Sequence, residues 1–139
     1  DTRTALAART LMLQALADYI DGAGAAAKLA IYAGVVPASV DDALAPGNTK
    51  LVEFTLAASP SFTVLDDVMS ATVPITAALA LVNGTATFCR VYRNNGTTVA
   101  FQGTVGTTTA DVILNSVTIV AGAPVGLTAV TYTLDEAAS

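Results

Sequence analysis

The feature that most constrains the fold of this chain is a turn between two runs of β-forming residues. The tripeptide Asn94-Asn95-Gly96 separates two stretches that are rich in Thr, Val and aromatic residues. Asn and Gly tolerate the positive φ angles of tight hairpin turns, so the tripeptide predicts a β-hairpin. The run after the turn alternates, with Val99, Phe101 and Val105 on one face. We therefore expect an antiparallel pair with one apolar face.

The length of the hairpin loop decides which side chains of the first run join that apolar face. A two-residue loop at Asn95-Gly96 would pair Tyr92 with Val99 and would place Arg90 on the Phe101 face. Because burying a charge without a partner is costly, we do not favour this register.

A three-residue loop avoids that cost. With Gly96 as the left-handed bulge residue, Val91 lies opposite Val99 and Cys89 lies opposite Phe101. We favour this register, in which the single cysteine of the chain is a small buried hydrophobic residue.

The favoured register leaves Phe88, Arg90 and Tyr92 together on the opposite face of the hairpin. A mixture of aromatic and cationic side chains makes this face a candidate interface. Two interpretations stay open. The face contacts a partner protein, or it is a strand face covered by a loop or by the N-terminal helix of the same chain.

A helix is predicted over residues 4–20, within an N-terminal helical arm that spans residues 1–24. Apolar residues that include Leu13, Leu16 and Ile20 recur at helical spacing, and no Pro or Gly interrupts them. This stripe either covers one face of a β core or docks on another subunit. Its three residues join the list of candidate interface residues.

The rest of the chain, residues 27–134, reads as short strands punctuated by turns, followed by a tail at 135–139. A long loop at 34–49 contains two prolines and stands out as a possible contact arm. Together with the helix, the pattern predicts one domain over residues 1–139. The predicted fold is mainly β, an antiparallel sandwich or jelly roll of about eight strands with one N-terminal α-helix. The expected strands are 28–33, 50–57, 62–65, 68–75, the two hairpin runs, 111–120 and 125–134.

Composition limits the class of partner. Charged residues make up 12% of the chain, about half the usual share, so we expect a neutral surface or one covered by other subunits. The net charge of −5 and the scarcity of basic residues argue against nucleic acid as a partner.

Residues 68–89 and 112–134 are uncharged, but Pro, Gly and Asn interrupt both stretches. Buried strands broken by turns explain them better than membrane spans.

The sequence contains no pattern that predicts catalysis. Histidine is absent and Cys89 is the single cysteine, which excludes His-based triads, His metal sites and an internal disulfide. The pairs Asp41-Asp42 and Asp66-Asp67 are best read as solvated turns. We therefore predict no catalytic, metal or cofactor site and no enzyme activity. No secretory signal is evident at the start of the sequence as given, which fits assembly in a reducing compartment.

Three segments taken together resemble the small cement or decoration proteins that stabilise the heads of tailed bacteriophages. These segments are the helix leading into residues 27–32, the run 84–91 and the run 103–116. The resemblance covers most of the chain, and it consists of packing and turn patterns rather than catalytic signatures. Cys89 stands where such phage proteins often carry a larger aromatic residue, which alters core filling more than role.

The resemblance implies a jelly-roll, non-enzymatic virion protein on the outer surface of the capsid, assembled in the host bacterial cytoplasm. It implies the major capsid protein as partner and a homo-oligomer, with a dimer favoured over a trimer. Two other classes stay open. A phage tail or receptor-binding module would need a trimerising stalk or clustered surface aromatics, and a carbohydrate-binding β-sandwich would need exposed aromatic platforms.

Overall fold

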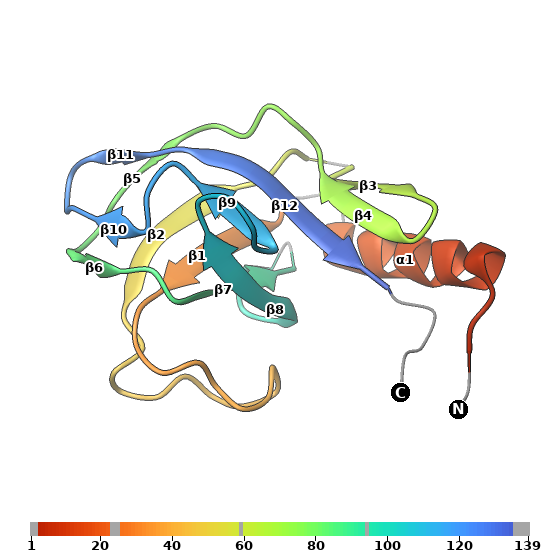
Figure 1. Ribbon diagram of the computed structural model, residues 1–139, viewed down its shortest axis with the longest axis horizontal. Coiled ribbons are helices and arrows are strands. Elements are labelled where there is room, and N and C mark those ends of the chain that lie inside the picture. The colour runs from red at the N-terminus through yellow and green to blue at the C-terminus, as the bar shows by residue number, and fades with distance from the viewer. Residues whose placement is uncertain (1–2, 23–25, 59, 94, 135–139) are drawn as a thin grey trace.

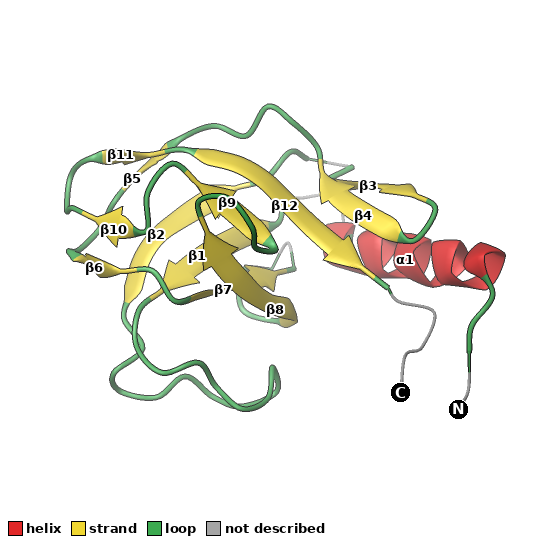
Figure 2. Ribbon diagram, viewed as in Figure 1, coloured by secondary structure: helices red, strands yellow, loops and turns green. Residues whose placement is uncertain are grey.

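The computed structural model describes residues 3–22, 26–58, 60–93 and 95–134 of the chain (Figure 1). It is mainly β with one N-terminal helix, as the sequence predicts (Figure 2). The elements are α1 (Leu6–Asp21), β1 (Lys28–Tyr32), β2 (Lys50–Thr55), β3 (Phe62–Leu65), β4 (Val68–Ala71), β5 (Ala78–Leu79), β6 (Gly84–Thr85), β7 (Phe88–Tyr92), β8 (Val99–Gly106), β9 (Val112–Leu114), β10 (Thr118–Ile119), β11 (Pro124–Val125) and β12 (Leu127–Thr133).

Eight of these strands form one curled sheet in the order β2-β1-β7-β8-β9-β12-β4-β3. Two further pairs, β10 with β6 and β11 with β5, form a small extension at the end of the molecule opposite the helix (Figure 1). The pairing is antiparallel except between β8 and β9, where Val105 lies opposite Val112 in a parallel arrangement. The expectation of a wholly antiparallel sheet is wrong at this point. The reason is local: Asp111 Oδ2 accepts a hydrogen bond from the Thr104 backbone N–H at 3.0 Å, which folds the connection back along β8.

The central hairpin forms around Gly96, whose φ is 76°, while Asn94 of the predicted turn lies outside the described residues. The predicted faces are confirmed, because Cys89 and Val91 share the apolar face with Phe101. The predicted partners are wrong. Next to the turn, Tyr92 lies opposite Val99, which is the pair of the register that we did not favour. An irregularity between Val91 and Tyr92 then shifts the pairing by one residue, so that Phe101 lies opposite Val91 rather than Cys89, and Cys89 lies opposite Gly103.

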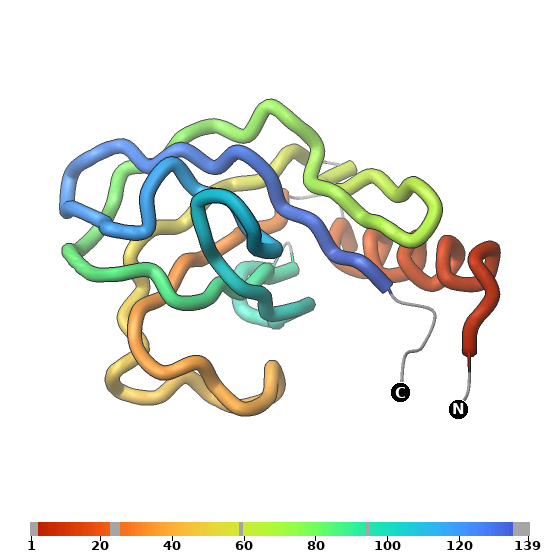
Figure 3. Tube along the Cα trace, viewed as in Figure 1, coloured from red at the N-terminus to blue at the C-terminus, as the bar shows by residue number. Residues whose placement is uncertain are grey.

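Helix α1 packs against β3, β4 and β8 (Figure 3). Its observed bounds agree with the predicted helix at 4–20 to within two residues. It ends at Gly22, whose φ of 47° suits glycine and whose N–H bonds to the Asp18 carbonyl oxygen at 3.0 Å. Leu13 and Ile20 point into the main core, which lies on the inner face of the curled sheet.

The connection between β1 and β2, residues 33–49, forms the covering loop, which includes the long loop predicted at 34–49. This loop projects from one side of the sheet (Figure 1). The end of the predicted helical arm at 23–24 and the predicted tail at 135–139 lie outside the described residues.

Candidate interaction surfaces

The helix stripe predicted as a contact lies inside the molecule. Leu13 and Ile20 are buried in the main core, and Leu16 packs against that core while partly buried. Two roles were left open for the stripe, and the structure agrees with the first of them, in which the stripe covers a β core. The three residues do not offer a surface to a partner in this conformation.

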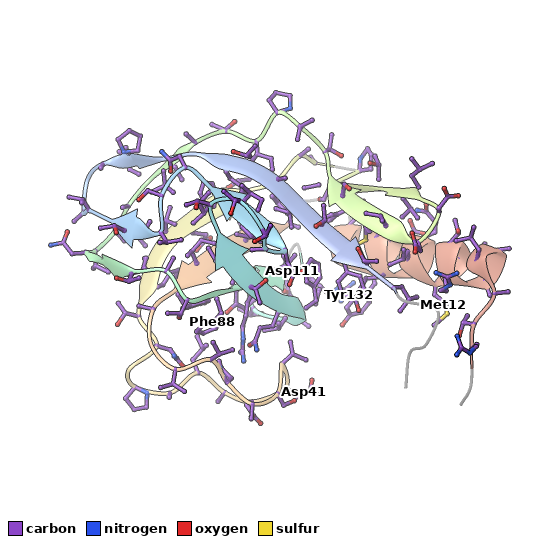
Figure 4. The ribbon with its side chains drawn as sticks, viewed as in Figure 1. Met12, Asp41, Phe88, Asp111 and Tyr132 are labelled. Carbon is purple, nitrogen blue, oxygen red and sulfur yellow. The ribbon has the colours of Figure 1, made fainter. Side chains whose placement is uncertain are left out.

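The hairpin face formed by Phe88, Arg90 and Tyr92 is also covered by the chain itself. Figure 4 shows Phe88 between β7 and the covering loop. Its ring stacks on that of Tyr32, with centroids 5.3 Å apart, and the hydroxyls of Tyr32 and Tyr92 are 2.6 Å apart. Burial, reinforced by the hydrogen bond with Tyr92, raises the pKa of Tyr32 well above its ordinary value. Tyr32, Phe88 and Ala30 therefore form a second, smaller apolar cluster, separate from the main core and packed against Leu44 of the covering loop.

Arg90 fastens the covering loop to the sheet. Its side chain is outside the main core, as predicted, but it is 3% exposed rather than open to solvent. Its Nη2 donates to the Asp42 carbonyl oxygen and its Nε donates to Gln102 Oε1, each at 2.9 Å. Gln102 Nε2 in turn donates to the Pro37 carbonyl oxygen at 3.3 Å. Of the two interpretations of this hairpin face, the loop-covered one matches the structure.

Two further side chains hold the ends of the covering loop. Asn48 Nδ2 donates to the carbonyl oxygens of Ala33 and Val35, at 3.2 and 2.8 Å, and Asn48 Oδ1 accepts from the Ala45 N–H at 2.8 Å. Thr87 Oγ1 donates to the Gly34 carbonyl oxygen at 2.8 Å. The loop is thus bound to its own sheet at several points along its length.

The two uncharged stretches of the sequence, 68–89 and 112–134, meet at the end of the molecule that carries β5, β6, β10 and β11 (Figure 1). We call this end the apolar tip and define it by its exposed hydrophobic residues. These are Leu79, Leu81, Val82 and Val120. The side chains of Leu79 and Val120 are 64% and 57% exposed, respectively.

Backbone hydrogen bonds hold the apolar tip together. The N–H of Ala80 donates to the Ala123 carbonyl oxygen at 2.9 Å, and that of Leu81 donates to the Leu51 carbonyl oxygen at 2.7 Å. The side chain of Asn83 adds a further bond, since its Oδ1 accepts from the N–H of Ala121, in the connection between β10 and β11, at 2.7 Å. An ordered, uncharged surface with several exposed apolar side chains is typical of a protein-interaction site. Sequence reasoning noted the two uncharged stretches, but it assigned them to buried strands and missed their shared exposed end.

The acidic pairs do not form a catalytic arrangement with each other. Asp67 pairs with Arg9 at 3.2 Å, and Asp42 Oδ2 accepts from the Ser39 N–H at 3.1 Å at the far end of the covering loop. Within the described residues, no group of three or more His, Cys, Asp or Glu side chains could hold a metal ion. Cys89 is fully buried, and burial raises its pKa to about 12, so its thiol is neither accessible nor ionised at neutral pH.

A hollow of about 410 Å³ beside β2 contains one carboxylate, that of Glu53, among small and apolar side chains. Glu53 Oε2 is paired with Lys50 Nζ at 2.7 Å. This arrangement offers no second titratable group for acid–base chemistry. Across the described part of the chain, no helix is long and apolar enough to cross a membrane.

Comparison of the chain with models of known protein families, with curated proteins and with solved structures finds no match.

Proposed function

We propose that this chain is a non-enzymatic structural protein of a bacteriophage head, a cement or decoration protein that binds the outer surface of the capsid. In this role it bridges major capsid subunits and stabilises the shell after assembly in the host cytoplasm. We also propose that its curled sheet is a jelly roll. Its support is the resemblance of the N-terminal helix leading into residues 27–32, and of residues 84–91 and 103–116, to such proteins, together with the surfaces described above.

The observation that carries the proposal is the apolar tip. Two stretches that are far apart in the sequence and free of charge combine there into one exposed surface. A partner surface that buries this tip gains about 25 cal/mol per Å² of apolar area, a gain that is offset by the cost of association. On a symmetric shell the same modest contact repeats many times, so weak individual contacts add up through multivalency.

Charge supports a position outside the shell. The chain carries a net charge of −5, and an acidic protein is repelled by packaged DNA. The buried Cys89 needs no oxidising compartment, which suits assembly in a bacterial cytosol.

The test is sedimentation of the purified protein with phage heads that lack it. We expect saturable co-sedimentation at a fixed ratio to the major capsid protein. Leu79→Asp, in the apolar tip, places a carboxylate in the contact and should weaken binding at least 10-fold, because a buried unpaired charge is costly. Leu65→Asp is the matched control, since Leu65 is also an exposed strand leucine but lies at the β3–β4 turn.

Wild-type protein that does not co-sediment with the heads would refute the proposed function. Equal binding by Leu79→Asp and wild type would remove the apolar tip from it. In the first case a glycan screen would test the carbohydrate-binding alternative, and host-cell binding would test the tail or receptor-binding alternative. All eight Phe and Tyr residues lie in the described part of the chain and Tyr19 alone among them is exposed, so an aromatic sugar platform has little support.

A further inference from the structure

Helix α1 carries a second apolar stripe, on the side that does not face the core. We call it the outer stripe and define it by four exposed residues: Ala8, Met12, Ala15 and Tyr19. Figure 4 shows Met12 on the edge of α1 that faces away from the β3–β4 hairpin. The spacing of four, three and four residues is the a/d spacing by which helices pack in coiled coils. Leu11, the neighbour of Met12 on the same side, is 72% exposed.

We propose that the outer stripe packs against the outer stripe of a second copy of this chain, with the two helices antiparallel. In that orientation the stripe is complementary to itself. Met12 meets Ala15 of the second copy, and Tyr19 meets Ala8 of the second copy, so that every large side chain faces a small one. Alternation of large and small residues across a helix pair is what allows close packing without voids.

The charges of the helix favour the antiparallel orientation. The first turn carries no acidic residue and the last turn carries no basic one, so the helix does not compensate its own dipole. Asp18 lies exposed in the last turn, where the negative end of the dipole disfavours it. An antiparallel second copy brings the positive N-terminal end of its helix beside Asp18, whereas a parallel copy would bring two such carboxylates together.

Tyr19 is already held in place for such a contact. The guanidinium carbon of Arg93 lies 4.0 Å from the centre of the Tyr19 ring, and Arg93 Nε donates to the Tyr19 carbonyl oxygen at 2.7 Å. A side chain that is ordered before binding loses less conformational entropy on association. The exposed ring therefore presents a fixed apolar surface rather than a mobile one.

The size of the helix sets the expected strength of the pairing. Sixteen residues give a helix of about 24 Å, so the contact lies at the small end of specific interfaces. We expect a dimer with a micromolar dissociation constant. The pairing needs no capsid, so its test is independent of the proposed function.

The first test is sedimentation equilibrium of the full chain without phage heads. Wild type should approach twice the monomer mass of 14.0 kDa as its concentration rises through the micromolar range. Ala8→Lys should raise the dissociation constant at least 10-fold, because it places a second cation beside the Arg93 that lies on Tyr19 of the second copy. Ala7→Lys is the matched control, an exposed alanine in the same helical turn that lies off the stripe and should leave the dimer unchanged.

Helical circular dichroism and the urea midpoint of each variant show whether it is folded at the concentrations used. A wild-type chain that stays monomeric, or a dimer that Ala8→Lys and Ala7→Lys affect equally, would overturn the pairing. Head binding by a monomeric wild type would refute the pairing and leave the proposed function standing.

The second test fixes the orientation by disulfide formation between Ala8→Cys and Tyr19→Cys proteins. Native Cys89 is fully buried and does not interfere. In the antiparallel pair position 8 faces position 19, so a mixture of the two variants should cross-link under mild oxidation. Each variant alone should not, because its two thiols are about 16 Å apart along the axis, beyond disulfide reach. Efficient cross-linking of Tyr19→Cys by itself would show a parallel pair and contradict the proposal.

Discussion

The buried thiol of Cys89 makes the stability of this protein depend on pH in a direction that the structure fixes. Burial raises the pKa of the thiol from 9.0 to about 12. A hydrogen bond with the Gly103 backbone opposes this rise, and the nearby charge of Asp111 adds to it by a smaller amount. The folded state therefore holds the proton more tightly than the unfolded chain. This contribution to stability is fully present below pH 9 and is lost as the pH rises toward 12.

The size of the loss follows from the two pKa values. Each pH unit between them costs about 1 kcal/mol of unfolding free energy once the unfolded thiol is ionised, which gives about 1–2 kcal/mol by pH 10. That is a measurable part of the free energy of unfolding of a typical domain, which is roughly 5–15 kcal/mol. Tyr32, whose pKa burial also raises, adds a loss of the same sign at higher pH.

The assay is urea unfolding of wild type and Cys89→Ala near neutral pH and near pH 10. Cys89→Ala should be less stable than wild type by about 1 kcal/mol near neutral pH, because it leaves a small cavity. Its stability should then fall less than that of wild type on going to about pH 10, since it has no thiol to ionise. Equal falls in the two proteins would refute the reasoning, because the loss would then come from other groups.

Three further predictions concern the covering loop and the two faces of the helix. Gly34→Ala should lower the unfolding free energy by about 1–3 kcal/mol, since Gly34 has a φ of 93° and a Cβ there would lie 2.5 Å from the Gly47 carbonyl oxygen. Gly47→Ala meets open space and should change stability by less than about 0.5 kcal/mol in the same urea assay. Leu13→Ala should cost about 2–5 kcal/mol and Leu11→Ala less than about 0.5 kcal/mol, and similar costs for both would contradict the assignment of the two helix faces. Asn48→Ala removes three hydrogen bonds and should cost about 1–3 kcal/mol, with faster hydrogen exchange confined to the covering loop; unchanged exchange there would show that other contacts suffice.

Elements with a strong local signal were predictable from the sequence. The helix, a hairpin around Gly96 and the long loop after β1 all appear where the sequence places them. Each rests on neighbours within a few residues, either the helical period or the tolerance of Gly for positive φ. The exact partners across β7 and β8 were not predictable, because one irregularity in the ladder shifts the pairing by one residue and so places Val91 opposite Phe101 although Tyr92 lies opposite Val99.

The candidate surfaces were harder to predict, because apolar spacing marks a face without saying what covers it. Leu13 and Met12 both lie on apolar stripes of one helix, yet the sheet covers the first and leaves the second exposed. Arg90 was expected on a face away from the main core, which is correct, but the covering loop 33–49 returns over it and supplies its partners.

The sequence alone determined that this chain forms a mainly β structure with an N-terminal helix, and that its surface carries few charges. Local period, turn chemistry and composition suffice for those conclusions, because they depend on residues that are close together in the chain. Only the tertiary structure decided which apolar faces remain exposed. Residues 68–89 and 112–134 come together at the apolar tip through the pairing of β5 with β11 and β6 with β10, a long-range contact that no local pattern encodes.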